Sequence, residues 1–328
     1  MDIHIYTPEF EFLHTIVNPI SVRWNLKYDD VGTLEIYVEP NDPAIPYFVE
    51  NDELIIVQGK YSAWCNGSAD DNGQFLISGR TLNWLLNTRQ VLPFEMTDTI
   101  EDVIRLKIAE QFMTIGKKFV NGFILDDPVD FTEEITYKVE GAPKSLFNVV
   151  KELCKMANLG FEIRFDYFEN KYIFSLYRGI DMSASQSDVP PIILSEVNRN
   201  LTQTQYLSNN EQYASCGYIR QVDEDTQEVS FSEVIKDDLT GFYRREVVLS
   251  AETEEDGVIE LFTKNRVVEI EGNIVGVEFD KDFGLGDIVT LQKVVGGKTI
   301  TQDRRVNEVI INQEVGNYTV TPVLGEVE

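Results

Sequence analysis

The sequence predicts a mainly β protein with an α+β segment between two β-rich regions. Strand-like alternation of apolar and polar residues, broken by tight-turn dipeptides, dominates residues 1–80. Helical periodicity is concentrated in residues 81–160, and alternation returns in most of the chain after residue 191. Because 328 residues are enough for about two domains with hydrophobic cores, these regions are expected to fold as parts of a globular protein.

The expected division has three parts. A first β domain is predicted at residues 1–95, an α+β helix-plus-hairpin domain at residues 96–180 and a second β domain at residues 181–328. The segment DMSASQSDVPP, residues 181–191, is rich in Ser, Asp and Pro and marks the clearest boundary. An acidic helical pattern predicts a small helical or hairpin insertion near residues 251–282.

The first region is typical of a meandering sheet. In GTLEIYVEPNDP, alternation places Leu34, Ile36 and Val38 on one face of a strand. The dipeptide Asn72-Gly73 favours a tight turn between two later strands.

Three segments of the middle region have helical periodicity. The first covers residues 81–89. The second opens at Asp98, with Glu101 three positions later as a capping pair, and the third begins at Pro143, a residue suited to a first helical turn. The alternating residues 161–179 that follow predict a hairpin packed against the third helix.

The net charge excludes one class of function. The chain has 28 basic and 56 acidic residues, which gives a formal charge of −28. A charge of this size repels polyanions, and the basic residues occur only in short groups rather than in runs interleaved with aromatics. Direct binding of nucleic acid is therefore not expected.

The cysteines and histidines indicate neither a metal site nor nucleophilic catalysis. Cys65, Cys154 and Cys216 are odd in number and far apart, without a CxxC pair, so buried free thiols are expected rather than disulfides or a zinc site. The two histidines, His4 and His14, both lie in the first strand region, and GxSxG is absent. No catalytic residue, metal ligand or cofactor is predicted.

A phosphate loop is not predicted either. Gly297-Lys298-Thr299 matches the end of a P-loop, but Gln292 stands where the earlier glycine belongs and strands surround the motif. The sequence shows no signal peptide and no apolar run of about 18 residues. Synthesis in a cytoplasm and a soluble chain without membrane insertion are expected.

Two alternatives stay open at this point. Paired carboxylates for sugar hydrolysis need no motif, and 56 acidic residues always contain pairs. Trp24, Trp64 and Trp84, with neighbouring Tyr and Phe residues, could line a sugar-binding groove, although aromatics on strands are more often core or interface residues.

A weak internal repeat indicates two related barrels. In NDELIIVQG and GLGDIVTLQK, a turn and then Asp52 or Asp287 lead into an apolar strand, and another alternating strand follows about 15 to 20 residues later. Chance similarity between β-hairpins is the alternative explanation.

The segment FLISGRTLNWLLNTRQVLPF, residues 75–94, predicts a structural corner. Gly79 is expected to bend a strand sharply into a helix, because glycine adopts turn conformations at little cost. The helix would pack its leucines, Leu82, Leu85 and Leu86, on the first barrel. Arg80 and Arg89 stand out in an acidic chain and are expected to anchor the helix to nearby carboxylates.

An ordered set of segments carries a family resemblance. RWNLKYDDVGTLEIYVEPND, NDELIIV, FLISGRTLNWLLNTRQVLPF, LYRGIDMSAS, GFYRREVVLSA and LGDIVTL occur in this order. Together they resemble the ReqiPepy-type siphophage tail proteins, relatives of the baseplate hub and of the N-terminal hub region of tail-associated lysins. The resemblance spans nearly the whole chain.

The resemblance implies two β-barrel hub domains in each subunit of a homotrimer, so that three chains form a six-barrel ring. Its implied partners are a hexameric distal tail protein, the tail tube and tape-measure protein, and a downstream fibre, spike or lysin. The expected location is the tail tip or baseplate of a virion. Gly79, Arg80, Arg89, Asp52 and Asp287 are the expected corner or interface residues.

A structural role without enzymatic activity is therefore expected. Tail-associated lysins continue into a peptidase or fibre domain, whereas this sequence ends at Glu328. Three chains would carry a charge of −84, three times −28, so that DNA is expected to pass through the ring lumen without binding. A receptor- or carbohydrate-binding adsorption protein is the alternative, and a cell-wall hydrolase is a third.

Overall fold

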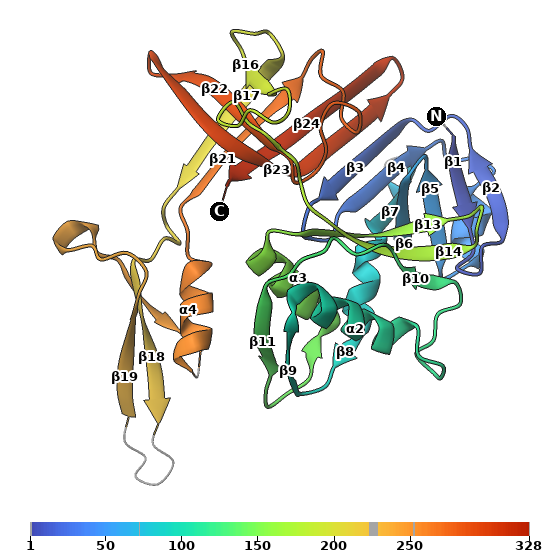
Figure 1. The fold of residues 1–328 in the computed structure, drawn as a ribbon. Helices are drawn as coiled ribbons and strands as arrows, with labels where there is room; N and C mark the ends of the chain where they lie inside the picture. The colour runs from blue at the N-terminus through green and yellow to red at the C-terminus, as the bar shows by residue number, and fades with distance from the viewer. Residues whose placement is uncertain (1, 72, 223–228, 252, 328) are drawn as a thin grey trace. The chain divides into compact units, whose positions relative to one another are not determined.

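The structure is a computed structural model that describes residues 2–71, 73–222, 229–251 and 253–327 (Figure 1). The chain divides into two compact units. The large unit comprises residues 1–204 and 271–328, and the small unit comprises residues 205–270. Most of the described elements are strands, so the predicted mainly β class is confirmed.

The first β part of the large unit is an antiparallel sheet whose strands do not all follow one another in chain order. Its strand order is β3-β4-β7-β6-β5-β1-β2. The predicted alternation is confirmed in β4, where Leu34, Ile36 and Val38 are buried. The elements are β1 Ile3–Tyr6, β2 Phe12–Ile16, β3 Ser21–Lys27, β4 Thr33–Val38, α1 Ile45–Glu50, β5 Leu54–Gln58, β6 Tyr61–Asp71 and β7 Gln74–Thr81.

The α+β part follows and packs on this sheet. Helices α2 and α3 contact each other, and the antiparallel hairpin β13–β14 directly follows α3, as predicted. One apolar core joins them to the first sheet. The elements are η1 Leu82–Thr88, β8 Gln90–Val91, β9 Phe94–Thr99, α2 Ile100–Phe112, β10 Phe123–Leu125, β11 Glu134–Val139, β12 Lys144–Ser145, α3 Leu146–Ala157, β13 Gly160–Asp166 and β14 Lys171–Tyr177.

The start of α2 differs from the predicted capping pair. Thr99, not Asp98, is the N-cap, and its hydroxyl accepts a hydrogen bond from the backbone N–H of Asp102. Glu101 is buried and its two carboxylate oxygens accept from the N–H groups of Val129 and Phe131 at 2.9 and 3.0 Å. Glu101 therefore holds this loop by hydrogen bonds and is not the capping partner that the local pattern predicted.

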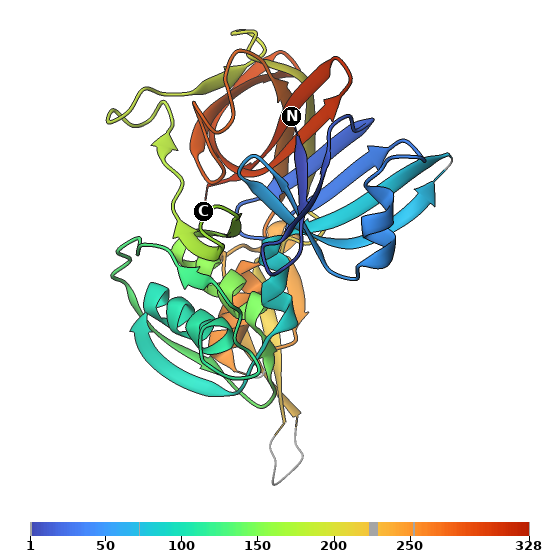
Figure 2. The ribbon, with the colours of Figure 1, turned by 90° about the vertical axis from the view of Figure 1, so that its right-hand side faces the viewer.

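The last β part completes the large unit. Figure 2 shows how strongly its C-terminal strands, orange to red, curve. Strands β17 and β21 cross the border between the two units. The elements are β15 Asp181–Met182, β16 Ile193–Ser195, β17 Leu201–Asn209, β21 Val267–Ile274, β22 Ile288–Val295, β23 Lys298–Glu314 and β24 Asn317–Glu326.

Strand β23 joins the two β parts into one sheet. Residues 298–305 pair with β22, residues 308–314 pair with β3, and β24 pairs with residues 304–314. An irregularity in the β24 pairing at Val306 and Glu308 lies between the two halves of the strand. Among the described residues the result is a sheet of fourteen strands, in which no closed barrel is found.

The small unit is a three-stranded sheet with one helix. Strand order is β19-β18-β20, and α4 contacts all three strands. The insertion predicted near residues 251–282 overlaps this unit, which begins earlier, at residue 205. Its elements are β18 Cys216–Val222, β19 Val229–Ile235, η2 Gly241–Tyr243, β20 Glu246–Leu249 and α4 Glu254–Phe262.

Two further observations bear on the sequence predictions. Cys65, Cys154 and Cys216 are buried and free, as expected. In the part of the chain that the structure describes, no helix has the length and apolar character needed to cross a membrane.

Candidate functional site at the Tyr28 junction

Tyr28 is a buried residue at which the three parts of the large unit meet. It directly follows β3, and its side chain is 4% exposed. Gly160, at the start of β13, and Gly286, just before β22, lie against its ring so closely that a Cβ atom on either would be 2.3 or 2.1 Å from ring carbons. Gly179, after β14, packs on the backbone carbonyl of Gly286 in the same way. We call this arrangement the Tyr28 junction.

Hydrogen bonds hold the tyrosine from both ends. Its hydroxyl donates to the carbonyl of Asn158 at 2.9 Å and accepts from the N–H of Gly179 at 3.3 Å. Its backbone N–H donates to the carbonyl of Asn307 at 2.9 Å, and its own carbonyl accepts from Phe161 at 3.1 Å. Burial raises the pKa of the hydroxyl, which therefore stays protonated and able to donate.

Asp287 supports the junction from the turn before β22. Its carboxylate is buried and accepts from the N–H groups of Ile180 and Gly284, both at 2.7 Å. Burial raises the pKa of this carboxyl, and the two N–H donors act in the opposite direction. Asp287 thus fixes the loop after β14 to the turn that carries Gly286.

The junction brings together segments that are far apart in sequence. Tyr28 belongs to RWNLKYDD, Gly179 to LYRGIDMSAS, and Gly286 with Asp287 to LGDIVTL. The sequence singled out Asp287 but missed Tyr28. No local pattern identifies that residue, because its role depends on contacts that span 130 positions or more.

A cleft of about 440 Å³ lies beside the junction. Its walls come from the first sheet, the β13–β14 hairpin and residues 279–287, which we call the strap. Asp280 fastens the strap to the first sheet: its carboxylate accepts from Lys60 Nζ at 2.6 Å and from the hydroxyl of Tyr61. Asp280 also has a φ of 68°, a conformation that costs energy for a residue other than glycine.

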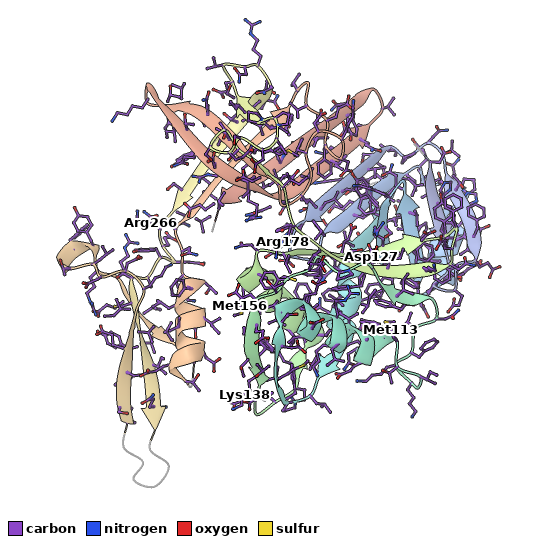
Figure 3. The ribbon with its side chains drawn as sticks, in the orientation of Figure 1. Met113, Asp127, Lys138, Met156, Arg178 and Arg266 are labelled. Carbon is purple, nitrogen blue, oxygen red and sulfur yellow. The ribbon has the colours of Figure 1, made fainter. Side chains whose placement is uncertain are left out.

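Charges in the cleft are largely paired. Arg164 lies 2.8 Å from Asp126 and 3.1 Å from Glu162, and Lys27 lies 3.6 Å from Glu308. Arg178, labelled in Figure 3, places its guanidinium 4.9 Å from the centre of the Phe131 ring. Within the described residues no group of three or more His, Cys, Asp or Glu side chains could hold a metal ion.

Glu162 is an acid of the cleft whose pKa is raised. Protein atoms surround its carboxylate on most sides, although the side chain still reaches the solvent of the cleft, and this burial raises its pKa. Arg164 and Lys60 act to lower the pKa, whereas Asp280 and Asp126 act to raise it. Glu162 is thus more easily protonated in the folded protein than in the unfolded chain.

The difference in melting temperature between Glu162→Gln and wild type should therefore depend on pH. The folded-state pKa lies above the usual 4.5, so the ionised glutamate destabilises the fold once the pH exceeds that value. We expect the melting temperature of the variant, relative to wild type, to rise from pH 4 to pH 8. The exposed Glu50→Gln is the control, and a difference that is constant over this range would contradict the assignment.

The family model described as Siphovirus ReqiPepy6 Gp37-like protein matches residues 2–264. The chain belongs to this family. The recognition made from the sequence segments is thereby confirmed, and a bacteriophage tail protein is the class that the family supports. A search of curated proteins gives no match.

Solved structures of tail proteins share the fold over its whole length. The 43 kDa tail protein of prophage MuSo2 from Shewanella oneidensis has a TM-score of 0.60 at 10% identity, covering 99% of this chain and 98% of that chain. The tail protein from Neisseria meningitidis MC58 gives 0.59 at 12%, covering 99% and 96%. Prophage tail protein gp18 from Listeria monocytogenes EGD-e gives 0.58 at 10%, covering 100% and 95%.

Gly79 is not the bend that the sequence predicts for this tail protein. Strand β7 continues to Thr81, and the segment after it is a 3-10 helix, η1, rather than an α-helix. Leu82 and Leu86 are fully buried and Leu85 is partly buried, in a core that α2 and α3 share with the first sheet, whereas the prediction packed all three on the first barrel. Gly79 instead lets β7 approach β6, since a Cβ atom there would lie 3.1 Å from the carbonyl oxygen of Trp64.

Replacing Gly79 by valine should still destabilise the large unit. The added side chain would press on the Trp64 carbonyl and on Ala63, whose Cβ is 3.3 Å from the position of the new Cβ. Overpacking of this kind costs about 1–3 kcal/mol. Urea denaturation would measure the loss. Gly67→Val is the matched control on β6, since nothing lies within 4 Å of a Cβ atom there. Equal stability of the two variants would contradict the close-packing role.

The two arginines stack on aromatic rings instead of pairing with acids. The guanidinium carbon of Arg80 lies 4.1 Å from the centre of the Trp84 ring, and that of Arg89 lies 5.2 Å from the centre of Phe112. Neither is within 4 Å of a carboxylate oxygen of the described residues, so the predicted carboxylate anchor is wrong for the isolated chain. Arg89 Nε is also buried without a hydrogen-bond partner among them.

Asp52 and Asp287 occupy unlike positions. Asp287 is buried and bonded to two backbone N–H groups, whereas Asp52 is exposed before β5 and its carboxylate makes no hydrogen bond within the described chain. The similar sequences therefore do not correspond to similar contacts at these two residues. An interface role for Asp52 stays a prediction.

Proposed function

We propose that this tail protein is the structural hub of a siphovirus tail tip. Three copies would form a ring in which the two β parts of each chain act as barrel-like segments, so that six such segments match a six-fold tail tube. The single observation that supports this most is the fold that the chain shares, over its full length, with prophage tail proteins.

The large unit is internally well connected, which suits a component that transmits force within a tail. Strand β23 makes the two β parts one continuous hydrogen-bonded sheet, and the Tyr28 junction fixes the α+β part to both. A chain of the Francisella PdpA–VgrG complex has a related fold, with a TM-score of 0.54 at 11% identity, and this chain spans 52% of that one. A fold used in such assemblies favours a structural role without catalysis.

The proposed neighbours are those of a hub. A hexameric distal tail protein, the tail tube and the tape-measure protein would lie on one side, and a fibre, spike or lysin on the other. The charge of −28 per chain would give the trimer −84, which would keep DNA from binding to the lumen wall during passage.

Solution mass and location in the particle test the proposal separately. Light scattering should give a species of three times 37.5 kDa, at least in the presence of the distal tail protein. Immunogold labelling of intact virions should place the chain at the tail tip. Labelling along the tube, or a monomer in every mixture and in the particle, would overturn the hub. Binding on a glycan array would favour the adsorption alternative, and lysis of cell walls would favour a hydrolase.

A further inference from the structure

Strand β19 of the small unit turns its larger side chains away from the core of that unit. Its pairing places Ser232 opposite Ile219 of β18, on the face that α4 covers. Residues of the other parity therefore lie on the opposite face, which we call the outer face. Phe231 and Ile235 are 61% and 52% exposed there, whereas the hydroxyl of Ser232 is buried without a hydrogen-bond partner among the described residues.

The other strands extend this exposed apolar surface. Val229 at the end of β19 and Val248 on β20 are 48% and 67% exposed, and the register of β20 with β18 sets Val248 beside Tyr218 on the outer face. A solvated sheet face normally carries polar side chains at alternate positions. Exposed apolar side chains gathered on one sheet face, here interleaved with Tyr218, Arg220 and Glu233, indicate an interaction site.

The apolar core of the small unit is limited in comparison. Among the described residues its buried apolar cluster has five members. Helix α4 can lie close to the sheet because Gly257 lacks a side chain, and Gly217 leaves room for the side chain of Leu249. A Cβ atom on Gly257 would be 2.2 Å from the side chain of Ile219. A unit of this size buries little apolar surface by itself, so covering the outer face would add substantially to its stability. The cluster consists of Ala214, Ile219, Val234, Leu249 and Leu261.

Arg244 joins two acids of the outer face. Arg244 donates to Glu233 and, at 2.6 Å, to Glu246, and the hydroxyl of Tyr218 lies 3.3 Å from both carboxylates. Arg220, exposed opposite Phe231 on the same face, adds a second cation, so the four charges Arg220, Arg244, Glu233 and Glu246 sum to zero. The paired Arg244 can therefore be covered by a partner without losing its carboxylates.

The net charge of the small unit distinguishes between possible binding partners of the outer face. Residues 205–270 contain 6 basic and 15 acidic residues, a net charge of −9. A second copy of the same face would bring −9 against −9, which like-charge repulsion disfavours. A different protein with an apolar surface edged by Lys and Arg complements both the exposed apolar side chains of the outer face and the net charge of the unit.

We propose that the outer face of the small unit, centred on Phe231, Ile235 and Val248, binds another tail protein through an apolar surface with a basic rim. The proposal goes beyond the trimeric hub and does not depend on it, because it concerns a face of the small unit alone.

Site-specific photo-crosslinking in assembled tails tests the occupant. A photoreactive phenylalanine analogue is placed at Phe231 and, as the matched control, at Ser230, which is exposed on the same strand but has the opposite parity. We expect adducts at Phe231 at least tenfold more abundant than at Ser230, joined to a different tail protein in a segment with more Lys and Arg than Asp and Glu. Adducts to another copy of this chain or to its own large unit, equal yields at both positions, or no adduct would each overturn the proposal.

A pair of variants separates docking from folding. Phe231→Ser combined with Ile235→Ser should leave the melting temperature of the free chain unchanged, because both side chains are exposed, and should reduce incorporation into tails at least tenfold. Ser230→Ala should leave both unchanged. Wild-type incorporation of the double variant would contradict the docking role. Trimer formation is tested independently by the solution mass. Either proposal can therefore fail while the other is supported.

Discussion

Replacing Tyr28 by alanine is expected to lower the free energy of unfolding of the large unit by about 3–5 kcal/mol, the usual cost of removing a buried aromatic ring. The ring fills the space between Gly160 and Gly286, and neither glycine has a side chain that could move into the cavity. The hydroxyl is lost as well, which leaves the carbonyl of Asn158 and the N–H of Gly179 without this partner.

Tryptophan fluorescence in urea is a suitable measurement, since Trp24, Trp64 and Trp84 all belong to the large unit. Tyr28→Phe is the matched control, because it keeps the ring and removes only the hydroxyl, at a cost of about 1–2 kcal/mol. If alanine were no more destabilising than phenylalanine, the ring would not be the element that joins the three parts.

Gly286→Ala is expected to destabilise the large unit by about 3 kcal/mol or more. The residue has a φ of 85°, a conformation that costs other residues about 1–2 kcal/mol. The new methyl group would also lie 2.1 Å from a carbon of the Tyr28 ring, so that the ring or the turn must shift, at about 1–3 kcal/mol. The displacement would also strain Asp287, which holds the adjacent turn.

Gly284→Ala is the control in the same turn. A Cβ atom there has only the carboxylate of Asp287 within 4 Å, at 3.7 Å, and its backbone needs no glycine-specific conformation. We expect near-wild-type stability for this variant and a lower urea midpoint for Gly286→Ala. Restoration of stability in Gly286→Ala by Tyr28→Leu would support the steric explanation, and equal midpoints for the two glycine variants would rule it out.

Local patterns were sufficient for most of the secondary structure. Alternation identified β4, and the succession of helix and hairpin identified α3 with β13 and β14, because in each case a periodic apolar stripe matches one buried face. Precise helix starts were less predictable. At α2, Glu101 was needed by the loop at Val129 and Phe131, a partner that no local pattern contains.

The candidate site was predictable only in part. Asp287 was singled out because it opens an apolar strand, and it is indeed buried at the junction, but the matching position of Asp52 is exposed. For Arg80 and Arg89 the acidic composition suggested carboxylate partners, whereas the nearest suitable surfaces in the fold are the faces of Trp84 and Phe112. Composition describes the average environment of a charge and not its neighbours.

The sequence by itself determined the mainly β class, the α+β segment in the middle and the tail-protein family, because periodicity and ordered motifs are local properties of the chain. Tertiary structure alone decided that β23 pairs with both β22 and β3, that Tyr28 is enclosed by glycines from distant segments, and that β19 exposes its larger side chains. The pairing of β23 with β3 and the Tyr28 junction join residues more than 100 positions apart, and such contacts have no signature in a local pattern. The exposure of β19 depends on which of its faces α4 covers.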